Sequence, residues 1–332
     1  MESPGFAGEK LYRPRRPEKT VFYSVLYHHY ERFAAEYEER FEREYGRWRN
    51  VISQTVRKYL DCGNLKRGFA RIRCPQCREE YLLGFSCKVR ICPSCSAKRS
   101  ALWADFVSTE VLQPVRHAHV VFSIPKLLRI FFRFNRKLLG EMSRCAWKAF
   151  RAYCGECLGK EVLPGGIFSI QTAGDALNWN PHIHALVCLG GYGADGVFQS
   201  LGSLDTGALR RLFEAYVMEM LVGKGLISRE LVEKIRSWRY TGFHVYCGMA
   251  LESVEEVVKV GYYIIRPAAS ASRLKSGGGV LRYEARAVGE EGGYDASLFE
   301  RPGETFDYLE WIARLTSHIP EKGAQTVHYY GK

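Results

Sequence analysis

Apolar residues recur at intervals of three and four over residues 20–60, and Tyr23, Leu26, Tyr27, Tyr30 and Phe33 follow this spacing. Such spacing is typical of amphipathic helices. Further helices are expected at 101–112, 126–153, 205–237 (two helices), 253–266 and 306–317. Apolar runs bounded by turn residues predict strands at 116–125, 167–172, 182–189, 241–251 and 279–287. The Ser-, Gly- and Lys-rich run 270–279 is expected to be a loop. Strands that alternate with helices favour an α/β or α+β protein.

The composition narrows the class of protein. The chain has 332 residues, enough for about two domains, and 46% of them are apolar and 25% charged. No run approaches the ~20 apolar residues of a membrane helix. The first 20 residues lack the apolar core of a secretory signal, so we expect a cytoplasmic protein. The formal net charge of +12 favours a nucleic-acid partner over a merely basic protein, and therefore a nucleoid-associated one.

The 11 cysteines point to metal rather than to disulfides, because no secretory signal accompanies them. Cys74 and Cys77 form one C-x-x-C motif, and Cys92 and Cys95 form a second, with 14 residues between the two. Each motif supplies two adjacent thiolates, and Zn²⁺ prefers four in a tetrahedron. The spacing therefore predicts a structural zinc ribbon built on these four cysteines.

The same segment carries two further cysteines and an excess of basic residues. Cys62 and Cys87 are candidates for alternate zinc ligands or for a second site, although each alone is more typical of a packed thiol. Aromatic residues alternate with cations, a pattern typical of surfaces that track phosphates and stack bases. The cations that we expect to contact DNA are Lys66, Arg67, Arg71, Arg73, Lys88, Arg90, Lys98 and Arg99. The alternative is that the aromatic residues only pack the ribbon.

A His-x-His pattern lies in one predicted strand. His182 and His184 should project from the same face, because side chains alternate along a strand. Two imidazoles at this separation can share one divalent ion. Asp175 is the expected third ligand, with Gln171 and His119 as alternatives. A set of two histidines with oxygen ligands suits Mg²⁺ or Mn²⁺ on a phosphate.

One tyrosine stands out among 20 by its position on a helix. Helical periodicity over 254–266 places Tyr262 toward the core and leaves Tyr263 on the polar face with Lys259 and Arg266. A phenol is a poor nucleophile at pH 7, so it needs cations and a polarised phosphate nearby. Arg266 and Lys259 are placed to hold that phosphate.

Taken together, these motifs resemble the rolling-circle transposases of the insertion sequence 91 type, which belong to the HUH endonucleases. The resemblance extends over residues 20–330 and is carried by CKVRICPSCSAKR, RHAHVVFSIP, GDALNWNPHIHALV and YYIIRP. It implies an α+β protein with an antiparallel catalytic sheet flanked by helices. It also implies cleavage of single-stranded or hairpin DNA at element ends through a 5′-phosphotyrosine. These roles fall on Tyr263, with His182 and His184 as metal ligands.

One feature refines the resemblance. Many members carry a second catalytic tyrosine four residues before the first, where this chain has Lys259, so the single-tyrosine branch fits better. Reuse of Tyr263 or a second subunit, as in a homodimer, would then be needed for a full cycle. The expected domains are a helical arm (1–60), a zinc-binding domain (61–110), the HUH domain (111–270) and a C-terminal extension packed on it (271–332).

Three other functions remain open at this point. A plasmid or phage replication initiator, or a relaxase, would use the same chemistry at an origin. A zinc-ribbon protein with an inactive catalytic domain would bind DNA without cutting it. A histidine-nucleophile hydrolase is disfavoured, because Leu186 stands where a third histidine is needed.

Overall fold

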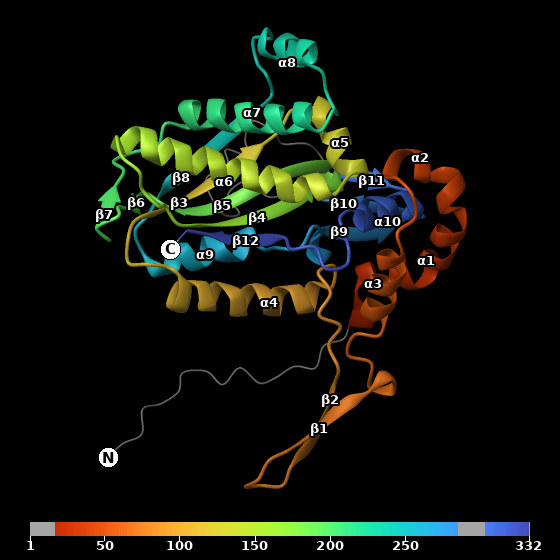
Figure 1. Ribbon diagram of the computed structural model, residues 1–332. Helices are drawn as coiled ribbons and strands as arrows, with labels where there is room; N and C mark the ends of the chain where they lie inside the picture. Colours follow the sequence, from red (N-terminus) through yellow and green to blue (C-terminus); the bar gives the residue numbers. More distant parts are fainter. Residues whose placement is uncertain (1–16, 285–302, 332) are drawn as a thin grey trace.

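The computed structural model describes residues 17–284 and 303–331. The fold is α+β, with helices packed on antiparallel sheets (Figure 1). In the described part of the chain, no helix is both long and apolar enough to cross a membrane.

A five-stranded antiparallel sheet forms the centre of the molecule, with the strand order β12-β4-β5-β3-β8. Its strands are β3 (His117–Ser123), β4 (Gly166–Ala173), β5 (Trp179–Cys188), β8 (His244–Leu251) and β12 (Val327–Tyr330). The first four were predicted, whereas the edge strand β12 was not. The middle strand β5 is hydrogen-bonded on both sides, so its side chains have fixed positions relative to β3 and β4.

Two long helices cover one face of this sheet (Figure 1). They are α6 (Lys137–Leu158) and α7 (Thr206–Gly223), accompanied by the shorter α5 (Arg129–Phe134) and α8 (Arg229–Arg236). Ile183, Ala185 and Val187 of β5 enter the main core beneath them.

The opposite face is covered by α9 (Val254–Ile264) and α4 (Pro93–Phe106), which ends in a π-helical turn (Val107–Val111). Leu186 of β5 packs there against Val257 and Ile264. The strand therefore alternates between two apolar layers, as its sequence pattern requires.

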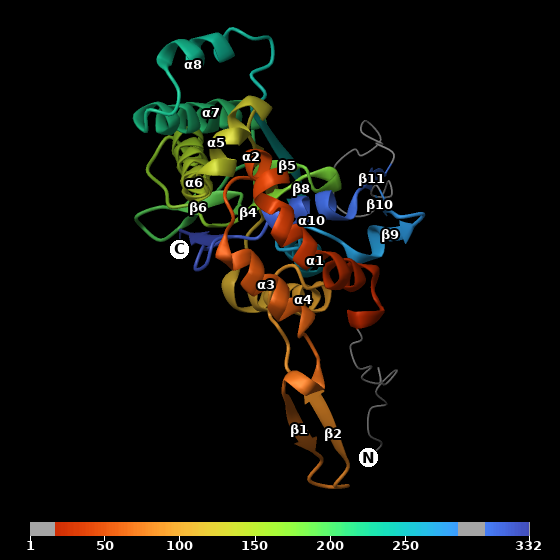
Figure 2. The same ribbon diagram turned by 90° about the vertical axis from the view of Figure 1, so that its right-hand side faces the viewer.

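A second core joins the two ends of the described chain. The helices α1 (Val21–Arg40), α2 (Glu42–Tyr45) and α3 (Asn50–Leu60) pack against α10 (Tyr308–Ser317). A small sheet also packs there, made of β9 (Leu274–Gly277), β10 (Val280–Tyr283) and β11 (Glu304–Phe306). Figure 2 shows this group from the side. The prediction of a loop at 270–279 was wrong, because β9 pairs with β10 in this sheet. Residues 285–287 of the predicted strand lie outside the described residues, as do residues 1–16 of the predicted arm.

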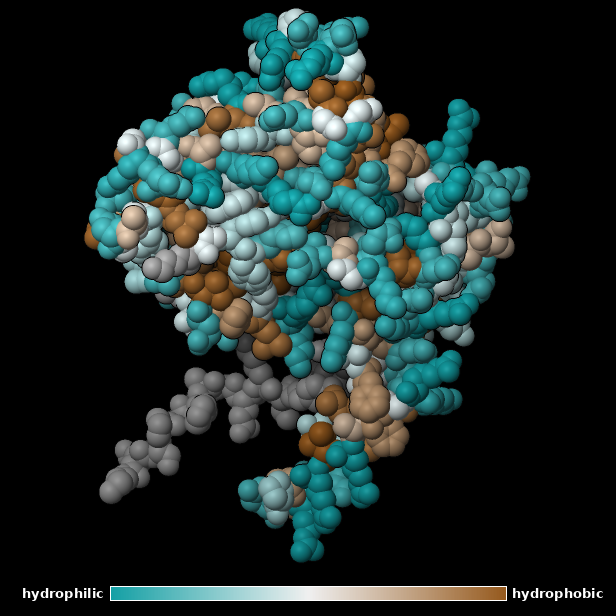
Figure 3. Space-filling model, viewed as in Figure 1, coloured by the Kyte–Doolittle hydropathy of each residue, from teal (hydrophilic) through white to brown (hydrophobic). Residues whose placement is uncertain are grey.

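A two-stranded hairpin of β1 (Phe69–Arg73) and β2 (Glu80–Gly84) projects from the body (Figures 1 and 2). Phe69, Tyr81 and Phe85 are exposed on it. Figure 3 shows apolar side chains near its base and hydrophilic ones at its tip. A second short hairpin is formed by β6 (Gly190–Tyr192) and β7 (Phe198–Ser200). Short 3₁₀ turns occupy Pro17–Lys19, Leu65–Arg67, Lys126–Leu128, Asp175–Leu177 and Ala271–Arg273.

Candidate active site and metal centre

Two imidazoles share the face of β5 that is turned toward α9. The Nε2 atoms of His182 and His184 are 3.1 Å apart, and both side chains are buried. His182 Nδ1 lies 2.6 Å from the carbonyl oxygen of Asn180. A carbonyl only accepts, so Nδ1 carries the proton and Nε2 presents its lone pair toward His184. Metal-binding histidines are commonly oriented by a hydrogen bond of this kind.

A third histidine, His119, contacts His184 on the side away from His182. His119 on β3 places Nε2 2.9 Å from Nδ1 of His184, and the two rings stack with centroids 5.1 Å apart. Burial, together with the charge of Arg266, lowers the pKa of His119 to about 4. The ring is therefore neutral at pH 7. It orients His184 through the nitrogen that does not face His182.

Helix α9 is fixed at both ends. At its start, the Ser253 hydroxyl accepts from the backbone N–H of Glu256, and the Glu256 carboxylate accepts from the backbone N–H of Ser253. At its end, Ser169 and Gln171 of β4 donate to the carbonyl oxygen of Ile264, at 3.0 and 2.7 Å. The last carbonyls of a helix lack hydrogen-bond partners within the helix, so these bonds from the sheet hold the end of α9 over β4. Gln171, an alternative metal ligand in the sequence prediction, has this anchoring role instead.

Tyr263 points from α9 into the histidine cluster. Its ring meets His184 edge-on with centroids 5.0 Å apart, and His119 edge-on at 5.7 Å. Tyr262 is 41% exposed, so the prediction that it enters the core was wrong.

The reason for this rotation lies in the neighbour on the other side of α9. Helix α4 crosses α9 at Gly261, where an added Cβ would lie 3.2 Å from the Cβ of Ala104. The helix is therefore buried on two sides, against the sheet and against α4. Helical periodicity assumes one buried side, so it assigned the two tyrosines to the wrong faces.

Arg266 lies against the candidate nucleophile. Its Nη2 donates to the Tyr263 hydroxyl at 3.2 Å, and its Cζ is 3.9 Å from the centre of the ring. The guanidinium places positive charge where a bound phosphate would carry negative charge. Lys259 is exposed one helical turn before Tyr263, as its polar position predicted.

Asp175 does not join the histidine cluster, so the predicted third ligand was wrong. The turn after β4 holds Ala176 and Leu177 in left-handed backbone conformations. It directs the Asp175 carboxylate toward Arg273, whose Nη2 is 3.9 Å away. Among the described residues, the only group of three or more His, Cys, Asp or Glu side chains with the geometry of a metal site is a cluster of four cysteines.

That cluster lies at the base of the hairpin. The Sγ atoms of Cys62, Cys87, Cys92 and Cys95 all lie within 4.8 Å of one another. Individual Sγ–Sγ distances are 3.6 Å for Cys62–Cys95 and Cys87–Cys95 and 3.8 Å for Cys62–Cys92. Four thiolates at ~2.3 Å from a tetrahedral Zn²⁺ would be about 3.8 Å apart. The cluster therefore has the dimensions of a Cys₄ zinc site.

The structure replaces half of the predicted zinc ligand set. Cys74 and Cys77 lie in the turn between β1 and β2, at the far end of the hairpin from the cluster. Cys62 follows α3 and Cys87 follows β2, so the base of the hairpin brings them beside α4. The ribbon predicted from the two C-x-x-C motifs is thus wrong in two of its four ligands.

Most predicted DNA-contacting cations are exposed around this region. The exposed set is Lys66, Arg67, Arg71, Arg73, Lys88, Lys98 and Arg99. Arg90 differs, because its guanidinium turns inward and donates to the hydroxyl of Thr326. It therefore does not belong to the exposed surface.

Comparisons with known proteins also separate the segment that carries the cysteine cluster from the segment that carries the histidine pair. Residues 29–124 match a family model described as "Transposase zinc-binding domain", and residues 165–332 match one described as "Putative transposase". The second match covers half of the chain and includes the paired histidines, Tyr263 and Arg266. The chain belongs to the transposases of the insertion sequence 91 type.

Two curated relatives of this transposase are similar over most of the chain. The "Transposase for insertion sequence element IS801" of Pseudomonas savastanoi pv. phaseolicola is 29% identical over 307 residues, which cover 87% of this chain and 72% of the relative. The "Putative transposase y4qJ" of Sinorhizobium fredii (strain NBRC 101917 / NGR234) is 27% identical over 285 residues, covering 78% and 68%. No solved structure matches the chain.

Proposed function

We propose that this transposase cuts and rejoins single-stranded DNA at the ends of a mobile element through a 5′-phosphotyrosine on Tyr263. The observation that carries the proposal is the convergence of Tyr263 and Arg266 with the histidine pair of β5. The ring of Tyr263 lies 5.0 Å from that of His184, and Arg266 donates to its hydroxyl. A nucleophile, a phosphate-binding cation and a metal-binding pair therefore meet at one place. The paired histidines on the middle strand of a five-stranded antiparallel sheet support an HUH-type fold.

The donor set fits a divalent ion. Two nitrogen ligands at ~2.1 Å from one ion lie roughly 3 Å apart, which agrees with the 3.1 Å between the Nε2 atoms of His182 and His184. The buried Oδ1 of Asn180, two residues before His182, has no hydrogen-bond partner among the described residues. A bound Mg²⁺ or Mn²⁺ would polarise the phosphoryl oxygen and neutralise its charge. The two histidines would occupy two coordination positions of this ion, and the other positions would be left for phosphate oxygens.

The chain's own residues then account for the transfer. The Tyr263 hydroxyl oxygen attacks phosphorus, loses its proton to solvent and forms a P–O bond. The bond from phosphorus to the 3′ oxygen breaks, and that oxygen takes a proton and leaves as a free 3′-OH. Arg266 steadies the phosphate beside the ring. One phosphodiester replaces another, so the step needs no outside energy source and a returning 3′-OH can reverse it.

The zinc cluster and the hairpin have a supporting role in this proposal. Zn²⁺ on Cys62, Cys87, Cys92 and Cys95 would fix the hairpin to α3 and α4. The exposed cations of this region would track the DNA backbone. One tyrosine holds one strand at a time, so joining two ends requires Tyr263 to act twice or a second copy of the chain. A homodimer remains a prediction.

Covalent trapping tests the proposal. Purified protein would be mixed with Mn²⁺ and end-labelled single strands that tile the DNA on either side of its coding sequence, and then run on a denaturing gel. Wild type and Tyr262→Phe should form a protein–DNA adduct, and Tyr263→Phe should form none while still binding the strands. His182→Ala should bind DNA but form little adduct at any metal concentration. An adduct that persists in Tyr263→Phe would refute the assignment, and binding without any adduct would favour an inactive DNA-binding protein.

A further inference from the structure

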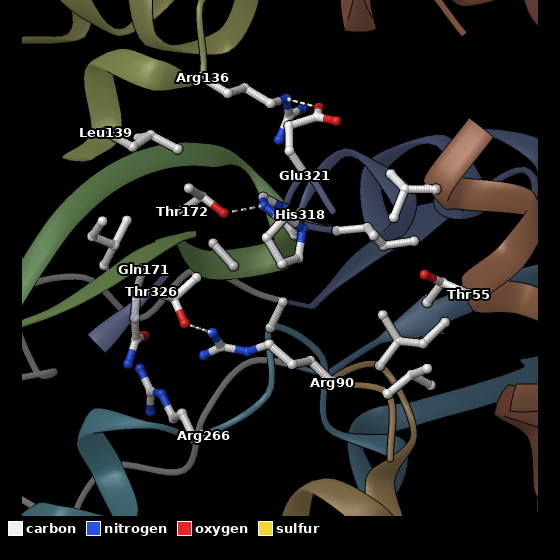
Figure 4. A pocket seen from close by; sticks show the side chains of 18 of the residues that line it. Thr55, Arg90, Arg136, Leu139, Gln171, Thr172, Arg266, His318, Glu321 and Thr326 are labelled. Carbon is white, nitrogen blue, oxygen red and sulfur yellow. Dashed lines mark hydrogen bonds and ion pairs between the residues drawn. The ribbon is translucent and has the colours of Figure 1, made fainter. Parts of the chain in front are cut away.

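A cavity of about 270 Å³ lies beside the candidate active site, where six parts of the chain meet. Its walls come from α3, from the loop between Cys87 and Cys92, from β4 and the start of α6, and from the segments that follow α9 and α10. Figure 4 shows Gln171 and Arg266 at one end, Arg136 with Glu321 at the other, and Arg90 with Thr326 between them.

Positive charge predominates around this cavity. Four cations line it, Lys88, Arg90, Arg136 and Arg266, against a single carboxylate of Glu321 in the described lining. Arg136 Nη2 is buried and has no hydrogen-bond partner among the described residues, and its Nε is 3.8 Å from Glu321. Arg90 donates to the neutral hydroxyl of Thr326. Burial lowers the pKa of Arg90 to about 10 and that of Arg136 to about 9. Guanidinium groups removed from water and facing so few carboxylates are stabilised by a bound anion.

The walls between these cations are apolar. Val51, Val89, Leu139, Ile170 and Ile319 line the space, and the hydroxyls of Thr55, Thr172 and Thr326 offer hydrogen-bonding groups at its edge. A space of this size admits one planar ring system with its sugar and excludes a duplex. Apolar walls, a few polar groups and arginines are the features by which proteins bind an unstacked base with its phosphate.

We propose that this cavity receives one unstacked nucleotide of single-stranded DNA, next to the phosphate that Tyr263 attacks. This inference rests on the proposed function, because it takes DNA as the substrate. It adds a binding site for a base to the catalytic centre.

Two contacts connect the cavity to the nucleophile. Arg266 lines the cavity and also donates to the Tyr263 hydroxyl at 3.2 Å. Gln171 lines it too, and its Nε2 donates to the carbonyl oxygen of Tyr263 at 3.3 Å. A nucleotide held there would fix the register of the strand at the reacting bond. A base of single-stranded DNA is already unpaired, so placing it in the cavity costs less than extracting a base from a duplex.

The zinc cluster also shapes this cavity. Lys88, Val89, Arg90 and Ile91 form the loop between two of the clustered cysteines, Cys87 and Cys92. Fixing both ends of so short a loop fixes the position of Arg90. The zinc-binding domain therefore contributes a wall of the DNA site in addition to the projecting hairpin.

Photocrosslinking tests the inference without requiring cleavage. The probes are single strands of about 20 nucleotides, randomised except for one central 4-thiothymidine or 6-thiodeoxyguanosine. After irradiation, mass spectrometry identifies the crosslinked peptides. Wild-type protein should crosslink through residues 88–91, Leu139 or Val51. Leu139→Trp, which fills the cavity, should reduce these crosslinks by about tenfold or more, while total binding of the strands changes far less. Ile130→Trp, at an exposed apolar position on the neighbouring α5, is the matched control and should leave them unchanged.

Wild-type crosslinks that fall only on the hairpin or elsewhere would overturn the inference, whether or not Leu139→Trp folds. Crosslinks that are unchanged in a folded Leu139→Trp would also overturn it. The covalent-adduct assay on the same samples separates this failure from that of the proposed function. Adduct without cavity crosslinks would refute the nucleotide site alone. Cavity crosslinks without adduct would support the site and count against Tyr263 as nucleophile.

Discussion

Replacing Cys62 by Ser removes one sulfur from the buried cluster and leaves both C-x-x-C motifs intact. The variant therefore separates the cluster seen in the structure from the ribbon expected from sequence spacing. Cys62 is 4% exposed and lies 3.6 and 3.8 Å from the sulfurs of Cys95 and Cys92. Hydrogen bonds from Cys87 and Cys92 lower the pKa of the Cys62 thiol, whereas hydrogen bonds within the same cluster raise the pKa of Cys87 and Cys92, so thiolate charge is shared unequally among the four sulfurs.

The expected effect is large. Structural zinc contributes on the order of 10 kcal/mol to the folding of small zinc domains at neutral pH. Losing one of four thiolates should cost a large part of that and leave three buried sulfurs without their ion. We expect Cys62→Ser to fall from about one zinc per chain to well below half after gel filtration with a mild chelator. Its melting temperature should also fall by several degrees or more.

The matched control is Cys74→Ser combined with Cys77→Ser, at the far end of the hairpin. This variant should keep one zinc per chain and the wild-type melting temperature, because neither sulfur belongs to the cluster. Zinc content would be measured by atomic emission, and melting by circular dichroism. Loss of zinc from the hairpin variant with full retention in Cys62→Ser would show that Cys74 and Cys77, and not Cys62, hold the ion.

Three further predictions concern the catalytic face. Gly261→Leu should lower the free energy of unfolding by about 1–3 kcal/mol in denaturant titration. The leucine side chain would meet α4, where even a Cβ lies 3.2 Å from the Cβ of Ala104. Unchanged stability and adduct yield would contradict the close contact between the helices. Arg266→Ala should slow adduct formation by about tenfold to a hundredfold, more than it weakens strand binding; an equal loss of both would make Arg266 only a binding residue. Burial, with the nearby Arg136 adding to it, lowers the pKa of His318 to about 3. The unfolded chain takes up this proton below pH ~6.5 and the folded chain does not, so stability falls as the pH drops toward 3, by about 2 kcal/mol at pH 5. His318→Gln should flatten that part of the pH–stability profile, and an unchanged slope would refute the assignment.

What the sequence predicted correctly followed from local backbone rules. The alternation of strand side chains placed His182 and His184 on one face, and the structure confirms this. Of the two C-x-x-C motifs, Cys74 and Cys77 lie in a turn as predicted but away from the cluster, whereas Cys92 and Cys95 stand at the start of α4 and present two sulfurs to it. Helix and strand positions in the middle of the chain were predicted because their apolar periodicities are long and clear.

What the sequence did not predict depends on contacts between distant segments. Spacing within a C-x-x-C motif does not show which other sulfurs approach it, so Cys62 and Cys87 were predicted only as alternate zinc ligands, and Cys74 and Cys77 were wrongly preferred. Tyr262 and Tyr263 were assigned to the wrong faces because Gly261 lets α4 bury a second side of α9. Asp175 was expected near the histidines, but a left-handed turn directs it to Arg273. Within the apolar strand β4, Ser169 and Gln171 alternate with apolar residues. This alternation was the one local sign that β4 holds the end of α9.

Peptide mapping of the adduct shows whether Tyr263 is the residue that becomes joined to DNA. The wild-type adduct would be digested with nuclease and trypsin, and the peptide that spans residues 260–273 would be fragmented in a mass spectrometer. We predict a nucleotide phosphate on Tyr263 and none on Tyr262. A phosphate on Tyr262, or on a peptide from another part of the chain, would contradict it.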